Sequence, residues 1–409
     1  MRVILGNCDN MLIYFLLVRI AALFNEKARK LSEGESRALD YLRKHIDKTQ
    51  QYVWFHVASV GEFEQARPIM DRLRKEQPDK KILLTFFSPS GYELKRGYKG
   101  ADIITYLPFA TKSNAKEFLD IVNPIQAIFA KYEFWPAYLK ELHKRNIPTF
   151  VFASIFRRSQ LFFKWYGKSY LNLLNYFTKI LVQDENSKSL LAEFGVNNVV
   201  VAGDTRFDRV IEIAGQPKFN TIIEEFKNVD DKPMLIAGST WWPDEELLIR
   251  YFNKHPDFKL LIVPHEIDKD HIDLLRDVLG GKALFYTEAT NENIVNYRCL
   301  VLNTLGMLST AYRYGNVAYV GGGFGAGIHN TLEAAVYGIP VVFGPKYKKF
   351  REARGLIECG GAFSIKNKQE LNNILDQLLA DGEAEGEKAG QYVEQQRGAV
   401  EVVYKELFS

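Results

Sequence analysis

The sequence predicts an α/β protein built from two parallel-sheet domains of the Rossmann type. Its 409 residues correspond to two domains rather than one, at about 150 residues each. Short apolar runs alternate with helical patterns along the chain, as in parallel strands that helices cover on both faces. Polar stretches interrupt this series, and we place the hinge between the two domains at about 203–217.

Before the hinge, apolar and β-branched runs of strand length are separated by helical patterns. The predicted strands are 52–57, 81–87, 102–107, 124–129, 149–152, 179–182 and 198–202. Clear helical patterns lie at 62–75, 114–122, 136–144 and 185–194. This part of the chain, 31–210, is predicted to form the first domain.

The second series begins after the hinge and has the same alternation. Its predicted strands are 233–237, 258–263, 297–302, 316–320 and 339–343. We expect a second domain at 211–390, followed by a final segment, 391–409, that packs on either domain as part of a polar helix over 383–408. In parallel α/β domains ligands bind beyond the carboxyl ends of the strands, so we expect the site in the cleft between the domains.

The composition excludes several classes of protein. Hydrophobic residues make up 47% and charged residues 25%, as in folded soluble proteins and unlike disordered or fibrous ones. The 53 Lys and Arg against 50 Asp and Glu leave a net charge of +3, too small a surplus to indicate nucleic-acid binding. Cys8, Cys299 and Cys359 have neither disulfide-framework nor metal-ligand spacing, so we expect a reduced compartment and no metal site.

The segment 11–24 is the compositional outlier, because it is apolar except for Arg19 and is followed by a basic stretch at 27–30. It is too short to cross a hydrocarbon core of about 30 Å, which takes about 20 residues. The polar residues that flank it do not fit a cleaved signal peptide. The pattern favours an interfacial helix, with 1–30 on an anionic membrane surface. A helix packed on the protein's own surface is the alternative.

Two acidic residues stand directly after predicted strands of the first domain. Glu62 follows the first strand in the sequence SVGE, and Glu133 follows the fourth in EFWP. Carboxylates at the carboxyl ends of one parallel sheet come near the same cleft, where partial burial raises a pKa and suits a general base. Glu62 also has a structural interpretation, since an acid in the first turn complements the helix dipole. Together the two predict a carboxylate pair for acid–base chemistry.

Arg157 and Arg158 follow the fifth predicted strand. Two guanidinium groups at this edge of the sheet suit an anionic ligand. A solvated surface pair is the equally ordinary alternative.

Two loops of the second domain, 237–243 and 321–330, have the sequence of phosphate-binding loops that open onto helices. An amide at the second helix start suits phosphate, and a carboxylate one turn later suits ribose hydroxyls. The glycine-rich loop has neither Walker nor dinucleotide-binding spacing; close packing is the alternative for its glycines, and an ordinary loop role for its histidine. The candidate residues are Ser239, Thr240, Gly322, Gly323, His329, Asn330 and Glu333.

Seven short motifs occur in order along nearly the whole chain. They are SVGE (59–62), EFWP (133–136), GDTRFD (203–208), AGST (237–240), VGGG (320–323), HNTLE (329–333) and GIPVVFGP (338–345). In this combination the chain resembles the 3-deoxy-D-manno-octulosonic acid (Kdo) transferases of lipopolysaccharide biosynthesis. The resemblance implies a glycosyltransferase B fold, a place on the cytoplasmic face of the cell inner membrane, and transfer of Kdo from CMP-Kdo to a lipid A precursor, lipid IVA, without metal or cofactor.

Carried over residue by residue, the resemblance implies that Glu62 deprotonates the acceptor hydroxyl in an inverting displacement. It implies that Glu133 orients the acceptor or the base. Four residues match the donor-binding side: Ser239, Thr240, Asn330 and Glu333.

The chain departs from the family at several positions. Arg206 stands where lysine is common, and Lys131 stands where an acid is usual. Thr331 and Ala334 replace two prolines of the usual motif, and His265 lies where an arginine is common. We therefore carry over no arginine contact to the nucleotide.

Two other classes share parts of this pattern. A sugar-nucleotide epimerase or hydrolase of the same fold would have the donor loops but no use for the segment 11–24. A two-domain solute-binding protein would carry a cleavable signal sequence and would have no reason for the SVGE register.

Overall fold

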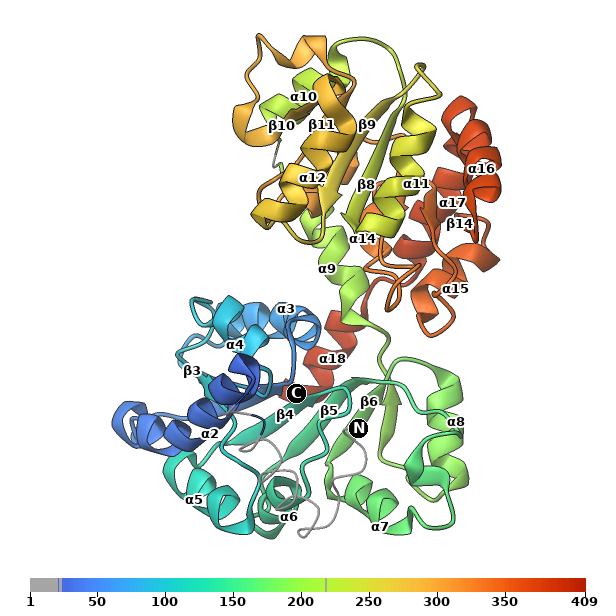
Figure 1. Cartoon of the computed structure of the whole chain (residues 1–409). Helices are drawn as coiled ribbons and strands as arrows, with labels where there is room; N and C mark the ends of the chain where they lie inside the picture. The colour runs from blue at the N-terminus through green and yellow to red at the C-terminus, as the bar shows by residue number, and fades with distance from the viewer. Residues whose placement is uncertain (1–20, 22–23, 218) are drawn as a thin grey trace. The chain divides into compact units, whose positions relative to one another are not determined.

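The computed structural model of the chain describes residues 21, 24–217 and 219–409 (Figure 1). The chain divides into two units, one made of the residues up to Arg209 together with Gly398–Ser409, and the other of Val210–Arg397. Each unit contains a seven-stranded sheet whose neighbouring strands are all parallel. The prediction of two parallel-sheet α/β domains is confirmed.

In the first domain the strand order is β3-β2-β1-β4-β5-β6-β7, so the order reverses between β1 and β4. The strands are β1 (Tyr52–Val57), β2 (Lys81–Phe86), β3 (Ile103–Tyr106), β4 (Gln126–Ala130), β5 (Thr149–Ser154), β6 (Lys179–Val182) and β7 (Val199–Val201). The helices are α2 (Glu26–His45), α3 (Val60–Glu76), α4 (Pro89–Lys95), α5 (Lys112–Val122), α6 (Pro136–Lys144), η2 (Leu161–Phe163), α7 (Lys168–Leu171), η3 (Asn172–Tyr176), α8 (Glu185–Glu193) and α18 (Ala399–Phe408).

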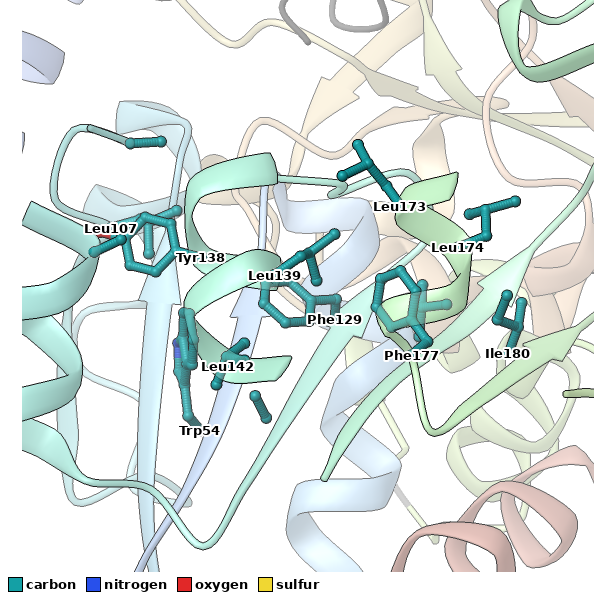
Figure 2. Close-up of a cluster of buried hydrophobic side chains, with 14 of the residues drawn as sticks. Trp54, Leu107, Phe129, Tyr138, Leu139, Leu142, Leu173, Leu174, Phe177 and Ile180 are labelled. Carbon is teal, nitrogen blue, oxygen red and sulfur yellow. The ribbon is translucent and has the colours of Figure 1, made fainter. Parts of the chain in front are cut away.

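Side chains of β1 point alternately to two hydrophobic cores, as the strand period of two requires. Tyr52 and Trp54 join the core under α5, α6 and η3, part of which Figure 2 shows. Val53 and Phe55 join the core under α3 and α18. Because both faces are covered, every residue of β1 is buried, which explains why the strand reads as a nearly continuous apolar run.

In the second domain the order is β10-β11-β9-β8-β12-β13-β14. The strands are β8 (Met234–Thr240), β9 (Lys259–Pro264), β10 (Ala283–Phe285), β11 (Cys299–Val301), β12 (Val317–Val320), β13 (Val341–Phe343) and β14 (Ala362–Ser364). The helices are α10 (Thr221–Asn228), α11 (Trp242–Phe252), α12 (Lys269–Leu279), η4 (Gly280–Lys282), η5 (Tyr286–Glu288), η6 (Ile294–Asn296), α13 (Leu308–Ala311), η7 (Tyr312–Tyr314), α14 (Leu332–Ala335), α15 (Arg351–Glu358), α16 (Lys368–Ala380) and α17 (Glu383–Gln395). The boundary between the two units falls within α9 (Thr205–Ala214).

The prediction of one helix over 383–408 is wrong. The structure has two helices, α17 and α18, with Gly398 between them at a φ of 108°, a left-handed conformation that glycine adopts readily. The carboxylate of Asp208 accepts hydrogen bonds from the N–H groups of Gly398 (2.8 Å) and Val400 (3.1 Å) and so caps α18. Beyond this break α18 packs against α3 in the first domain (Figure 1).

The predicted membrane segment 11–24 lies outside the described residues, apart from positions 21 and 24. Helix α2 begins two residues after the end of this segment, at Glu26, with the Asn25 side chain accepting a hydrogen bond from Ala28 N–H (3.1 Å). None of the helices that the structure describes is both long and apolar enough to cross a bilayer.

Candidate functional site

The two acids predicted for the first domain follow β1 and β4, which are neighbours in its sheet. The strand order reverses between these two strands. At such a switch point the loops on either side diverge and leave room for a ligand. Glu62 and Glu133 therefore stand at the place in the first domain where the topology favours binding.

Glu62 lies in the first turn of α3 and is buried, with 6% of its surface exposed. Its Oε2 accepts a hydrogen bond from the backbone N–H of Ala58, just before the helix. Ser59 at the N-cap makes no side-chain capping bond, so the Glu62 carboxylate takes part of that role. Glu62 is thus placed to complement the helix dipole, as its structural interpretation requires, and the bond to Ala58 holds the carboxylate in one orientation.

Glu133 is buried in a polar network that the sequence does not predict. Its Oε2 accepts a hydrogen bond from the indole of Trp135 (3.0 Å) and lies 3.3 Å from Nε2 of His56. His56 is fully buried in β1, and its Nδ1 is 2.9 Å from Oγ1 of Thr85. A histidine in an otherwise apolar strand, one residue before the strand ends, is the signal that identifies this residue in the sequence.

The network determines which nitrogen of His56 carries a proton. Thr85 Oγ1 receives the indole N–H of Trp54 (2.8 Å), and its own hydrogen points to the carbonyl oxygen of Phe55 (3.3 Å). The remaining lone pair of Thr85 therefore accepts from Nδ1–H of His56. Nε2 of His56 faces both the Glu133 carboxylate (3.3 Å) and the indole N–H of Trp135 (3.1 Å).

The backbone that carries Glu133 adopts a conformation that non-glycine residues rarely have. Lys131, at the end of β4, has a φ of 56°, and Ala153, in β5, has a φ of 57°. The β5–β6 pairing changes register between Val151 and Ser154, and Ser154 Oγ donates to the carbonyl of Lys131 (2.6 Å). Strained backbone of this kind gathers at functional sites, where the surrounding packing maintains it.

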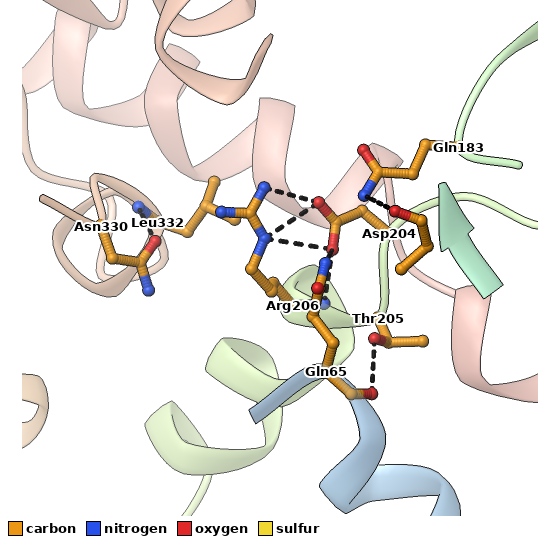
Figure 3. A network of polar contacts seen from close by, with 8 residues as sticks. Gln65, Gln183, Asp204, Thr205, Arg206, Asn330 and Leu332 are labelled. Atoms are coloured by element: carbon orange, nitrogen blue, oxygen red, sulfur yellow. Dashed lines mark hydrogen bonds and ion pairs between the residues drawn. The ribbon is translucent and has the colours of Figure 1, made fainter. Parts of the chain in front are cut away.

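Two of the three candidate arginines have carboxylate partners. Arg158 forms an exposed ion pair with Glu193. Arg206 pairs with the buried Asp204 (2.7 Å), which Gln65 also contacts (3.1 Å), as Figure 3 shows. Burial by itself raises the pKa of Asp204, but the Arg206 guanidinium and the hydrogen bonds outweigh it and hold that pKa at about 2.

In the second domain the order reverses between β8 and β12. Ser239 and Thr240 lie at the end of β8, and the glycine-rich loop follows β12. Ser239 has a φ of 52°, again unusual for a residue with a side chain. Thr240 Oγ1 donates to Oε1 of the buried Glu245 (2.8 Å), so its hydroxyl is engaged within the domain.

Asp244 joins the two loops of this switch point. Its Oδ2 accepts from the backbone N–H groups of Trp241 (3.0 Å) and Gly322 (2.9 Å), and its Oδ1 accepts from the Tyr319 hydroxyl (2.8 Å). Burial raises the pKa of Asp244 despite these bonds. The N–H of Gly322, which the sequence predicts to face phosphate, is therefore directed at a carboxylate of the protein itself.

Close backbone packing accounts for two of the glycines. A Cβ added at Gly321 would lie 2.3 Å from the carbonyl oxygen of Ser239, and one at Gly323 would lie 2.5 Å from Cα of Gly344. No side chain fits at such distances. The glycines allow three loops of the second domain to meet at one edge of its sheet.

His329 belongs to an aromatic stack that the sequence does not predict. Its ring lies 4.3 Å, centroid to centroid, from His265, which lies 4.7 Å from Trp241. The Trp241 indole donates to Nε2 of His329 (3.1 Å), so the neutral ring carries its proton on Nδ1. Burial, and then the neighbouring His265, lower the pKa of His329 to about 4. Trp241 and His265 directly follow Thr240 and Pro264, and that position after a strand end is the signal they share with the predicted residues.

Asn330, just before α14, contacts Glu333 in the first turn of that helix. Asn330 Nδ2 donates to Oε1 of Glu333 (3.0 Å), and its Oδ1 accepts from Leu332 N–H (3.2 Å). The Thr331 hydroxyl is buried and has no hydrogen-bond partner within the part of the chain that the structure describes. Helix α14 has only four residues, so its dipole contributes less than a full-length helix would.

Among the described residues, no group of three or more His, Cys, Asp or Glu side chains is arranged to hold a metal ion.

Comparisons with known proteins place these features in a family. The sequence model of the 3-Deoxy-D-manno-octulosonic-acid transferase (kdotransferase) family matches residues 33–209. The 3-deoxy-D-manno-octulosonic acid transferase of Aquifex aeolicus is 28% identical over 338 residues, which cover 80% of this chain and 86% of that protein. The transferase of the same name from Rickettsia bellii is 26% identical over 380 residues, covering 90% and 88%.

Among solved structures, UDP-GlcNAc 2-epimerase from Neisseria meningitidis, bound to UDP-GlcNAc, aligns with a TM-score of 0.60 at 15% identity. The alignment covers 87% of this chain and 99% of that one. At this identity the likeness concerns the fold, which both domains share with glycosyltransferase B enzymes. Residues 33–209 therefore match the 3-deoxy-D-manno-octulosonic acid transferase family, and most of the chain is similar to glycosyltransferases of that name.

Proposed function

We propose that the protein transfers Kdo from CMP-Kdo to lipid IVA, a lipid A precursor, at the cytoplasmic face of the cell inner membrane. One observation supports this most strongly: the predicted acids and the predicted donor loops stand at the two switch points of the two sheets. Similarity to Kdo transferases over most of the chain supports the same reaction.

In the proposed reaction a hydroxyl of the acceptor sugar transfers its proton to the carboxylate of Glu62. The acceptor oxygen attacks the anomeric carbon of Kdo from the face opposite CMP, and the bond from that carbon to the phosphate oxygen of CMP breaks. The configuration inverts, and CMP leaves with the electron pair. A positioned carboxylate base contributes about 10²–10⁴-fold to such a step.

Glu133 orients the acceptor in this proposal, and His56 is a positioning residue that acts through Glu133. The imidazole of His56 and the indole N–H of Trp135 fix the Glu133 carboxylate. A carboxylate held by these two rings in a buried site needs little reorganisation when substrate binds.

The second domain binds the donor. Asn330 and Ser239 contact the phosphate, and Glu333 accepts hydrogen bonds from the ribose hydroxyls. His329 presents Nδ1–H to the donor, because Nε2 is engaged by Trp241. The lysines at 346, 348 and 349 add positive charge beside the glycine-rich loop; Lys346 and Lys349 donate to its carbonyl groups at Gly325 (2.7 Å) and Ala326 (3.0 Å).

The test incubates the full-length protein with CMP-Kdo, with and without lipid IVA in detergent. We expect CMP release that depends on the acceptor, and a product whose mass exceeds that of lipid IVA by one or more Kdo residues. CMP release at the same rate without acceptor would contradict transfer and indicate a hydrolase of the same fold. Absence of CMP release in both reactions would remove CMP-Kdo as the donor.

A further inference from the structure

Trp165 and Tyr166 project from the first domain. Their exposed fractions are 92% and 59%, and no large hydrophobic side chain among the described residues is more exposed than Trp165. Aromatic side chains of this size usually bury most of their surface. They lie between η2 and α7, flanked by Lys164 and Lys168, and we call residues 164–168 the aromatic tip.

The aromatic tip is held in a tight turn. Gly167 N–H donates to the carbonyl of Lys164 (2.8 Å), and Lys164 N–H donates to that of Leu161 (3.1 Å). A Cβ on Gly167 would lie 1.8 Å from the Leu161 carbonyl oxygen, so the turn closes only around glycine. Phe162 and Phe163, just before the turn, are buried in the hydrophobic core. The tip is therefore a fixed projection on an anchored base.

The chain segment that carries the aromatic tip has charged side chains of one sign. Residues 154–183 contain five Lys or Arg and no Asp or Glu, although the whole chain has 50 acids in 409 residues. Arg158 and Lys179 pair with acids elsewhere in the first domain. Within the described part of the chain, neither Lys164 nor Lys168 has a carboxylate within ion-pair distance. This charge is complementary to an anionic surface.

The base of the aromatic tip and the C-terminal end of α2 contact the same hydrophobic core of the first domain. Phe162 and Phe163 pack in the same core as Leu42 of α2, whereas α3 and α18 pack in the core on the other face. Helix α2 starts directly after the segment 11–24, whose sequence predicts an interfacial membrane helix. A bilayer that binds this segment would thus be tethered to the domain that carries the tip.

We propose that the aromatic tip inserts into the headgroup region of an anionic lipid bilayer as a second membrane contact of the first domain. The indole and phenol rings lie at the hydrocarbon boundary, where their apolar bodies and polar atoms are both satisfied. The ammonium groups of Lys164 and Lys168 meet lipid phosphates, while their methylene stems lie along the acyl region.

A protein partner fits this projection less well than a bilayer. Two aromatic side chains bury about 150–250 Å² each, whereas stable protein interfaces bury about 1,200–2,000 Å². An interfacial membrane contact needs only a few such side chains when basic residues flank them and another segment of the chain binds the same surface.

The first experiment measures sedimentation of the full-length protein with vesicles of phosphatidylethanolamine and phosphatidylglycerol. We expect the double variant Trp165→Ala/Tyr166→Ala to lower the partition constant about tenfold or more, since it removes the two rings that would be buried in the bilayer. Lys164→Glu/Lys168→Glu should weaken binding to these vesicles more than binding to phosphatidylcholine vesicles. The matched control is Leu94→Ala, which removes a 64%-exposed apolar side chain from the same domain and should leave the constant unchanged.

The second experiment measures how deeply the Trp165 side chain inserts into the bilayer. Trp165 fluorescence should be quenched by lipids brominated near the headgroup, and the quenched component should be missing in Trp165→Phe. Absence of quenching in the wild type, or unchanged partition of the alanine variant, would overturn the proposal. So would conversion of a dimer to a monomer by that variant in sedimentation velocity without vesicles, because the tip would then bind a second copy of the chain.

The proposal concerns a membrane contact and does not rest on the proposed reaction. Transfer to detergent-dispersed lipid IVA should be the same for the aromatic-tip variants and the wild type. If the aromatic-tip variants lose vesicle binding but keep full transfer in detergent, the membrane contact is supported independently of the reaction. If the wild type and all variants bind vesicles but none transfers Kdo, only the proposed reaction is contradicted.

Discussion

The switch points of the two domains are built from different parts of the polypeptide. In the first domain, buried side chains dominate: Glu133 contacts His56 of β1, and Glu62 lies in the helix that follows β1. In the second, backbone dominates, because Asp244 binds N–H groups of two loops and glycines let those loops approach closely. The first arrangement suits proton transfer and the second suits the shape of a donor. Substitutions in the first domain should therefore change mainly kcat, and those in the second mainly the affinity for donor.

The largest effect should come from Glu62→Gln. The amide can still accept the N–H of Ala58, so α3 should begin as before, but it cannot take a proton from the acceptor. We expect transfer to fall by about 10²–10⁴-fold, measured as CMP release in the presence of lipid IVA. The control is Glu64→Gln, on the same helix, whose carboxylate pairs with Lys95 (2.6 Å). Substantial transfer by Glu62→Gln would remove Glu62 from the role of base.

A smaller loss should follow His56→Phe, which keeps an aromatic ring in β1 and removes both nitrogens. The Glu133 carboxylate then loses its contact with Nε2 of His56. We expect kcat to fall about 10–100-fold with little change in the donor KM, and the pH profile of kcat to change shape. An unchanged profile with an equally reduced kcat would instead indicate a general loss of packing.

Asp244→Leu tests the second-domain switch point. The apolar side chain cannot accept the N–H groups of Gly322 and Trp241, so these donors lose their partner, at a cost of about 1–3 kcal/mol each in the free energy of unfolding. We expect the donor KM to rise about tenfold while kcat changes little. Glu246→Gln, on the same helix and exposed, is the control. A fall in kcat without a change in donor KM would contradict the division between the domains.

The smallest effect on activity, and a distinct effect on stability, should come from Glu35→Gln in α2. Burial raises the pKa of Glu35 from 4.5 to about 8. Between these values the folded state keeps a proton that the unfolded state releases, so the free energy of unfolding falls as pH rises from about 4.5 to about 8. Urea unfolding of wild type at pH 5 and pH 8 should show this decline, of a few kcal/mol at about 1.4 kcal/mol per pKa unit. Glu35→Gln should remove it.

His329 in the second domain should have the opposite pH dependence. The lowered pKa of His329, about 4, means that the unfolded chain binds a proton at a higher pH than the folded chain. The contribution of His329 to the free energy of unfolding is therefore lost as pH falls from about 6.5 to about 4.

For Glu35, equal slopes of the free energy of unfolding against pH for wild type and Glu35→Gln between pH 5 and 8 would contradict the assignment of the first decline to that residue.

The sequence predicts the central strands well because they are buried on both faces. Each predicted strand overlaps a strand of the structure, whereas the edge strands β10 and β14 are not predicted. Each has three residues and follows closely after two glycines, at 280–281 and 360–361, which break up the apolar pattern. The break between α17 and α18 depends on Asp208, which is 190 residues from Gly398. A helical pattern by itself carries no such information.

In the candidate site, too, some features follow from the local sequence and others depend on residues far apart in the chain. Glu62, Glu133 and Ser239 are identifiable because they follow strands, and their position is a local property of the sequence. The partners that orient them are not: His56 is 77 residues from Glu133, and Asp244 is 78 residues from Gly322. These contacts arise from strand order, which brings β1 beside β4 and β8 beside β12.

The most direct test of the division between the domains is calorimetric titration of CMP into full-length Glu62→Gln and Glu333→Gln. We predict wild-type affinity for Glu62→Gln and affinity at least about tenfold weaker for Glu333→Gln, which would lose the charge-assisted hydrogen bond that we propose Glu333 makes to the ribose. Wild-type affinity for Glu333→Gln together with weakened binding by Glu62→Gln would contradict the account.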